Sequence, residues 1–156
     1  MRSTLHTQRC GDFPDRQIFN FVEDSGACPL QASAAVRTHG HDAQVIYRCA
    51  RAAYNLSVVD PSRKAALLDE ALRLVRDAKA LNSRDSNILR WSGIILQAWS
   101  EGQSTKEYIE AAFKVKGDWE AAVEANPRDA RSWHLLGRWA LAVSAMPYWK
   151  RSLAVS

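Results

Sequence analysis

The sequence lacks the features of several large classes of protein. In its 156 residues, no apolar run approaches the roughly 20 residues that a membrane-crossing helix needs. The first residues contain no apolar core of the kind found in a secretory signal peptide. Sustained alternation of apolar and polar residues, which is typical of half-buried strands, is also missing. We therefore expect an intracellular, all-α protein without a transmembrane segment.

Cysteine is scarce as well. The three cysteines, Cys10, Cys28 and Cys49, are odd in number and widely separated, so they fit neither a disulfide framework nor a CxxC motif. We interpret them as reduced thiols.

Patterns that carry catalysis are few. No glycine-rich phosphate loop is present, and the acidic residues lie at ordinary helical surface spacings. The pair His39 and His41 beside Asp42 is compatible with a metal site, but solvated histidines in such a loop are roughly ten times more common. We expect no enzyme activity, no cofactor and no bound metal.

The net charge of +4 is too small for a dedicated nucleic-acid binder. The excess lies entirely after residue 60, where it favours an acidic partner if the arginines share one face. Aromatic stacking on RNA is an alternative, but helical spacing makes core packing the better interpretation of the six tryptophans, Trp91, Trp99, Trp119, Trp133, Trp139 and Trp149.

Two regions of the sequence differ in composition. We expect residues 1–40 to form an N-terminal segment with one short helix near 14–23 and loops, and residues 41–156 to form a helical domain. Asp60 with Pro61 predicts a helix start, and Ser104 with Glu107 forms a capping box. The expected helices cover about 42–58, 61–81, 85–100, 104–125 and 129–144, with a last short one from Pro147.

An internal repeat underlies these helices. The stretch 78–85 returns 44 residues later as 122–129, and the same shift places Gly93 on Gly137. The pattern WxxLG from Trp133 to Gly137 is that of the tetratricopeptide repeat, although the spacing exceeds the usual value of about 34. We predict two full helix pairs and one further first helix, which begins at Val45. Aligning the three first helices gives spacings of 42 and 44 residues between them. Antiparallel pairs would stack into a short right-handed superhelix.

Three stretches carry a resemblance to a known family. They are IYRCARAA at 46–53, STKEYIEAAF at 104–113 and LLGRW at 135–139, and they are similar to the regulator of microtubule dynamics family over about residues 42–155. The resemblance implies a non-enzymatic cytoplasmic protein of the cytoskeleton that associates with microtubules and spindle poles and contributes to chromosome segregation. It also implies that some members lie at mitochondria or organelle contacts, although residues 1–40 show no membrane anchor.

The resemblance further implies another helix pair after the position of Ser156. We expect an apolar edge around Trp149 and Leu153 that is suited to self-association.

A partner would bind the groove that the first helices of such pairs line. The groove positions hold four arginines and no acid, which suits an acidic segment such as the glutamate-rich tails of tubulin, or other proteins with acidic segments. Alternatively, these arginines are solvated or paired to neighbouring helices. The candidate partner-binding residues are Arg48, Asn55, Asn87, Arg90, Gln97, Arg131, His134 and Arg138.

A generic tetratricopeptide scaffold of other specificity is the main functional alternative. The carboxylate clamp of chaperone-type repeats is not formed, because its positions hold Arg48, Ala52 and Trp91. The repeat also predicts that Gly137→Leu destabilises the fold by overpacking.

Overall fold

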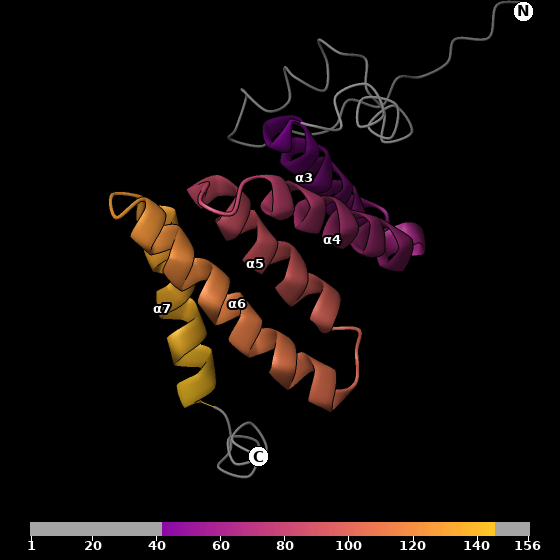
Figure 1. Cartoon of the computed structure of the whole chain (residues 1–156). Coiled ribbons are helices and arrows are strands. Elements are labelled where there is room, and N and C mark those ends of the chain that lie inside the picture. The colour runs from indigo at the N-terminus through magenta and orange to yellow at the C-terminus, as the bar shows by residue number, and fades with distance from the viewer. Residues whose placement is uncertain (1–41, 146–156) are drawn as a thin grey trace, which may run out of the picture.

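The computed structural model describes residues 42–145. They form five α-helices, with one 3-10 turn, in which consecutive helices run antiparallel and pack as neighbours along the chain (Figure 1). The elements are α3 (Ala43–Val59), η1 (Pro61–Arg63), α4 (Lys64–Leu81), α5 (Ser86–Ser100), α6 (Thr105–Ala125) and α7 (Ala130–Ser144).

The all-α prediction and its sequential helix pairs are confirmed within these residues. The predicted short helix near 14–23 and the one from Pro147 lie outside the described residues, and so do Trp149 and Leu153. The right-handed superhelix stays a prediction.

The helix starts follow from capping side chains. The carboxylates of Asp42, Asp85 and Asp129 each accept a hydrogen bond from the backbone N–H two residues on, at 2.8, 2.8 and 3.2 Å. Ser104 forms the predicted capping box: its Oγ accepts from the Glu107 N–H at 3.4 Å, and Glu107 accepts from the Ser104 N–H at 3.1 Å. These bonds satisfy amides that the first helical turn leaves without partners.

One predicted start is wrong by three residues. Asp60 and Pro61 open the 3-10 turn, and α4 begins only at Lys64. The Asp60 carboxylate accepts from the Ser62 N–H at 3.2 Å and from the Arg63 side chain at 2.7 Å. These bonds, together with the Arg63 N–H donating to the Asp60 carbonyl at 3.3 Å, hold a tight turn before the α-helix.

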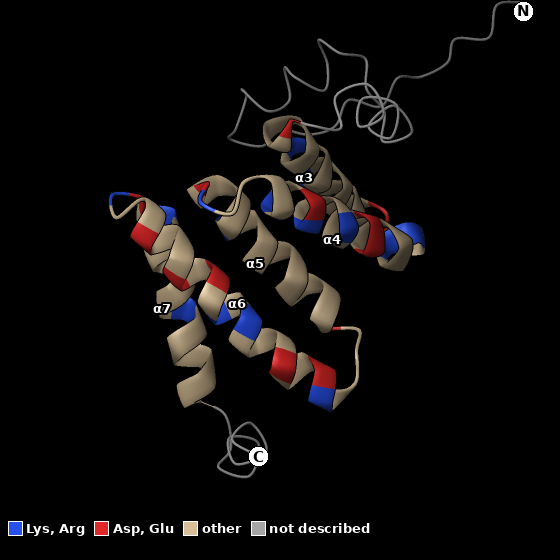
Figure 2. Cartoon of the chain, in the orientation of Figure 1, with Lys and Arg blue, Asp and Glu red and all other residues tan. Residues whose placement is uncertain are grey.

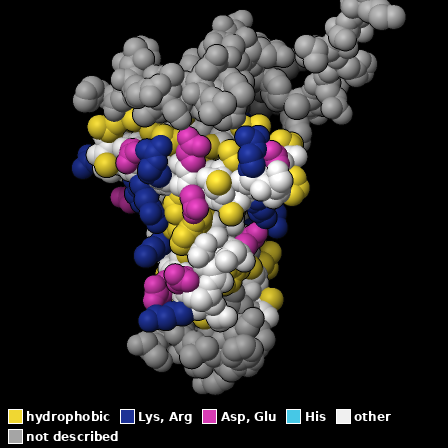
Figure 3. All heavy atoms as spheres, turned by 90° about the vertical axis from the view of Figure 1, so that its right-hand side faces the viewer, with side chains coloured by type: hydrophobic (Ala, Val, Ile, Leu, Met, Phe, Trp, Pro, Cys, Tyr) yellow, Lys and Arg dark blue, Asp and Glu magenta, His cyan; other side chains and the backbone are white. Residues whose placement is uncertain are grey.

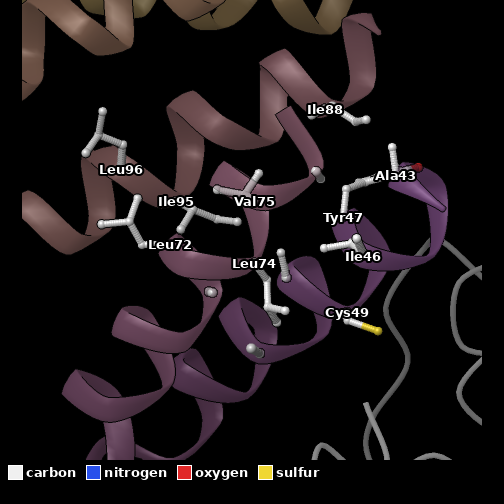
Figure 4. Close-up of a cluster of buried hydrophobic side chains, with 14 of the residues drawn as sticks. Ala43, Ile46, Tyr47, Cys49, Leu72, Leu74, Val75, Ile88, Ile95 and Leu96 are labelled. Atoms are coloured by element: carbon white, nitrogen blue, oxygen red, sulfur yellow. The ribbon is translucent and has the colours of Figure 1, made fainter. Parts of the chain in front are cut away.

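The core lies mainly between α3, α4 and α5 (Figure 4). Ala50 of α3 and Ala71 and Val75 of α4 are fully buried, so small side chains let these two helices approach closely. Ile88 and Ile95 of α5 close the same cluster from the other side. Cys49 is a buried free thiol, as predicted for that residue, and burial followed by the Glu70 charge raises its pKa.

The repeat glycines differ in their surroundings. A Cβ on Gly93 would lie only 2.3 Å from Nε1 of Trp119, whose indole crosses α5 there and is 2% exposed. A Cβ on Gly137 would meet no atom of the described residues within 4 Å. Within residues 42–145 no helix covers Gly137 as α6 covers Gly93, so the overpacking expected for Gly137→Leu stays a prediction. The same packing argument holds at Gly93.

Candidate partner-binding face

The eight predicted residues lie on the first helices of the pairs, which are α3, α5 and α7. Their exposure varies: Asn87 is half-buried, Arg90 is buried, and the other six are exposed. The exposed residues are Arg48, Asn55, Gln97, Arg131, His134 and Arg138.

Arg90 joins α5 to α7 instead of facing solvent. It is 8% exposed, and its guanidinium donates to the carboxylate of Asp129 and to Oδ1 of Asn87, the latter at 2.9 Å. Burial opposes ionisation of Asp129, but hydrogen bonds from Ser132 and Arg90 and the Arg90 charge outweigh it, so the pKa of Asp129 is lowered. The alternative of pairing to a neighbouring helix is thus confirmed for Arg90, which leaves three of the four predicted arginines to be considered.

A similar contact joins α3 to α5. Gln44 Nε2 donates to Oδ2 of Asp85 at 2.8 Å, so each of these two first helices holds the N-cap aspartate of the next one. The three caps, Asp42, Asp85 and Asp129, are spaced by 43 and 44 residues. The predicted alignment of α3, which used spacings of 42 and 44, is therefore one residue out of register.

With the caps aligned, the α3 residues at the groove positions are Gln44, Tyr47, Arg51 and Tyr54. They replace the predicted Val45, Arg48, Ala52 and Asn55, so Arg48 is no longer a groove residue. Arg51 lies 4.7 Å from the centre of the Trp91 ring, and Tyr54 meets the same ring edge-on at 5.8 Å. Sequence reasoning missed these two residues. The signal that identifies them is the recurring N-cap aspartate, because it marks the helix start more sharply than the hydrophobic pattern does.

A cavity of about 290 Å³ is lined by residues of α5, α6 and α7 and by Tyr54 of α3. It brings together two of the predicted residues, Gln97 and Arg138, above an apolar lining that includes Ile94, Leu135 and Trp139. Burial, followed by the Glu101 charge, raises the pKa of Tyr54, so its hydroxyl keeps its proton. The lining is mainly apolar, and its charged side chains are Arg138 and the acidic Glu101.

Two exposed arginines and one exposed histidine of this face lie together on α7. Arg131, His134 and Arg138 recur at three and four residues and therefore share one side of the helix. Their side chains make no hydrogen bond or ion pair to another residue of the described part of the chain. We call these three residues the α7 cluster.

Charge is segregated between the two kinds of helix. No Asp or Glu occurs within α3, α5 or α7, whereas α4 and α6 carry both signs (Figure 2). In α4 and α6, oppositely charged residues four positions apart form ion pairs, among them Arg73 with Asp77 at 3.5 Å and Lys116 with Glu120 at 2.6 Å. On the face in Figure 3, basic and acidic side chains are interspersed, so that face shows no patch of a single sign.

Most of the described tryptophan rings pack against other residues of the protein instead of facing solvent. The indole N–H of Trp119 donates to the Arg90 carbonyl at 3.2 Å, and that of Trp139 donates to the Ala112 carbonyl at 2.9 Å. The indole N–H of Trp99 donates to the Asp69 carboxylate at 2.7 Å. Trp133 is the exception at 52% exposed. The core interpretation thus holds for most of the tryptophans that the structure describes.

The described residues contain neither a cluster of metal ligands nor a helix that could cross a membrane. Between residues 42 and 145, no three His, Cys, Asp or Glu side chains gather as metal ligands would. His39 and His41 lie outside this range. Among the described helices, none combines the length and the apolar character that crossing a membrane requires.

Comparison with known proteins places the chain in a family. The family model described as Regulator of microtubule dynamics protein 1-3 matches residues 26–156. Regulator of microtubule dynamics protein 1 of Bos taurus is 33% identical over 116 residues, which is 72% of this chain and 37% of the relative. The Mus musculus protein of that name is 31% identical over 116 residues, 72% of this chain and 38% of the relative.

A more distant relative is Regulator of microtubule dynamics protein 3 of Xenopus laevis. It is 25% identical over 118 residues, 74% of this chain and 26% of the relative. The chain thus spans about a third of the length of the curated relatives that it matches. On the extent of these matches, the chain belongs to the regulator of microtubule dynamics family.

Proposed function

We propose that this chain is a non-enzymatic microtubule-associated protein that binds acidic segments, such as the glutamate-rich tails of tubulin, through its first helices. The observation that carries the proposal is the segregation of charge, because the first helices contain arginine but no acidic residue. Planar guanidinium groups bind carboxylates through two parallel hydrogen bonds. In this role the chain would contribute to microtubule dynamics and chromosome segregation in the cytoplasm and at spindle poles.

The α7 cluster is the centre of the proposed interaction. Arg131 and Arg138 are exposed and have no acidic partner in the described part of the chain, so a carboxylate can approach without breaking an existing pair. Arg90 contributes differently, because it fixes α7 against α5 through Asp129. The proposed site is therefore narrower than the eight residues of the sequence prediction.

The cavity beside Arg138 defines what else the bound segment needs. Its lining of Ile94, Leu135 and Trp139 fits an apolar or aromatic side chain next to the acidic group. An acidic stretch with one such side chain would fill both parts of the site.

The test is co-sedimentation with polymerised microtubules. The double variant Arg131→Glu with Arg138→Glu is expected to lose binding, because it reverses both free guanidinium charges. A matched control, Arg76→Glu with Lys114→Glu, makes the same charge change on exposed positions of α4 and α6 and is expected to retain binding. Circular dichroism verifies that all variants keep their helicity.

Three results would count against the proposal. Unchanged binding by the α7 variant would show that this face is not the contact. Equal loss in both variants would show that net charge alone governs binding. Absence of any microtubule binding by the unaltered chain would favour the alternative, a tetratricopeptide interaction scaffold for another partner, including one at organelle contacts.

A further inference from the structure

The cavity lined by α5, α6 and α7 has a fixed apolar interior. Val115 and Trp119 of α6 line it and are 1% and 2% exposed. The indole N–H of Trp119 donates to the Arg90 carbonyl at 3.2 Å, and that of Trp139, another lining residue, donates to the Ala112 carbonyl at 2.9 Å. These hydrogen bonds hold both rings in place, so the space is formed before a ligand enters.

The size of the cavity suits one aromatic side chain. Its volume of about 290 Å³ exceeds the roughly 150 Å³ of a cavity that binds benzene. Ala98 and Ala112 line it with a single methyl group each, which leaves the space between the larger side chains open. A ring that carries one small polar substituent therefore fits.

The edge of the cavity carries charges of both signs. Gln97, Glu101 and Arg138 line the cavity and are exposed, so this edge faces solvent. In the part of the chain that the structure describes, no hydrogen bond or ion pair engages any of these three side chains. The Glu101 charge, after burial, raises the pKa of Tyr54, which is another lining residue. The cavity thus combines an acceptor and a cationic donor that have no partner among the described residues.

These two charges restrict which side chain enters the cavity. A carboxylate inside would face Glu101, and a cationic group would face Arg138, so a neutral side chain is favoured. A phenol is neutral, and its hydroxyl can donate a charge-assisted hydrogen bond to the Glu101 carboxylate. The hydroxyl lies at the end of the ring farthest from the backbone, which lets the flanking residues of the ligand remain at the edge beside Arg138.

We propose that the acidic segment bound by this chain carries a tyrosine, which inserts its ring into the cavity and donates its hydroxyl hydrogen to the carboxylate of Glu101. A carboxylate that flanks this tyrosine pairs with Arg138. The inference rests on the proposed function, because it names the residue that the acidic segment needs beside its carboxylates. Such a contact distinguishes one acidic segment from another, which charge alone does not.

Three short peptides test this contact. Each contains six glutamates around a central residue, which is tyrosine, phenylalanine or alanine. Each is labelled with a fluorophore and titrated with the full 156-residue chain, and binding is followed by fluorescence polarisation. The tyrosine peptide is expected to bind saturably, at least fivefold more tightly than the phenylalanine peptide and at least tenfold more tightly than the alanine peptide.

The first pair of protein variants tests the hydroxyl contact. Glu101→Ala removes the acceptor together with one negative charge. It is expected to strengthen binding of all three peptides, while the ratio of tyrosine to phenylalanine affinity falls to about one. Glu124→Ala is the matched control, because it makes the same charge change at an exposed residue of α6 that does not line the cavity. This control is expected to retain the ratio.

The second pair tests occupancy of the cavity. Ala142 of α7 is exposed and lines the cavity, so Ala142→Phe fills the space from its edge. This variant is expected to bind all three peptides with the affinity of the alanine peptide. Ala125→Phe makes the same change at an exposed residue of α6 outside the lining and is expected to leave the preference for tyrosine unchanged. Circular dichroism verifies that every variant keeps its helicity.

The outcomes separate this inference from the proposed function. Equal binding of the tyrosine and phenylalanine peptides would overturn the inference, and so would a preference for tyrosine that Glu101→Ala leaves unchanged. If the peptides bind equally and the Arg131→Glu with Arg138→Glu variant loses that binding, the proposed function stands without the tyrosine. No saturable binding of any peptide would overturn both.

Discussion

Substituting alanine at the two repeat glycines is expected to change stability in opposite directions. In Gly93→Ala the new Cβ would lie 2.3 Å from Nε1 and 2.7 Å from Cδ1 of Trp119, too close for any real contact. The ring cannot rotate away cheaply, because it is 2% exposed and its N–H donates to the Arg90 carbonyl. Moving it costs packing, the hydrogen bond or both.

The magnitude follows from three contributions. Alanine in a helix interior gains about 1 kcal/mol over glycine. Overpacking costs about 1–3 kcal/mol, and a buried indole N–H without a partner costs about 1–3 kcal/mol more. Gly93→Ala is therefore expected to lower the free energy of unfolding by about 1–5 kcal/mol. Gly137→Ala meets no described atom within 4 Å and is expected to raise it by up to about 1 kcal/mol.

Urea unfolding followed by circular dichroism at 222 nm measures both changes. Gly117→Ala in α6 is the control for helix propensity, since its Cβ position is also open. A Gly93→Ala protein as stable as the Gly137→Ala and Gly117→Ala proteins would refute the packing argument.

Three further predictions concern the polar contacts. Arg90→Ala leaves the Asp129 carboxylate without its buried partner and is expected to destabilise the fold by about 3–5 kcal/mol, measured by urea unfolding; a loss under 1 kcal/mol would contradict a buried pair. Because the folded pKa of Asp129 is lowered from its usual 3.8, its contribution is complete above that value and is lost as the pH falls through the folded pKa. Asp129→Asn is therefore expected to flatten the acid side of the stability profile, and an unchanged slope below pH 4 would be inconsistent with this. Ser104→Ala removes the capping box with Glu107 and is expected to lower the free energy of unfolding by about 1 kcal/mol, measured by thermal or urea unfolding. No change would mean that water satisfies the freed backbone N–H equally well.

The helical class and most helix bounds were predictable because their determinants are local. The capping box at Ser104 and the helix stop at Asn126 and Pro127 depend on neighbouring residues, and α6 begins and ends where they predict. Asp60 and Pro61 form a similar local signal, but there the Arg63 and Ser62 contacts favour a 3-10 turn first. The sequence pattern of a helix cap does not show whether an α-helix or a 3-10 turn follows it.

The site was less predictable because exposure depends on partners distant in sequence. Arg90 and His134 occupy equivalent positions of the groove pattern, yet His134 is exposed whereas Arg90 is buried and paired with Asp129, which lies 39 residues away. Likewise Gly93 and Gly137 are equivalent in the repeat, and only the presence of α6 over Gly93 distinguishes them. A repeat pattern indicates which positions face a neighbour but does not reveal whether a neighbour is present.

The proposed function requires that the first helices bind acidic segments electrostatically. The most direct measurement is co-sedimentation of the full chain with microtubules across a salt series, using intact microtubules and microtubules from which the acidic tails have been removed. Electrostatic capture of the tails predicts binding to intact microtubules that weakens steadily with salt, and no binding once the tails are gone. Binding that is independent of salt and unchanged by removal of the tails would contradict it.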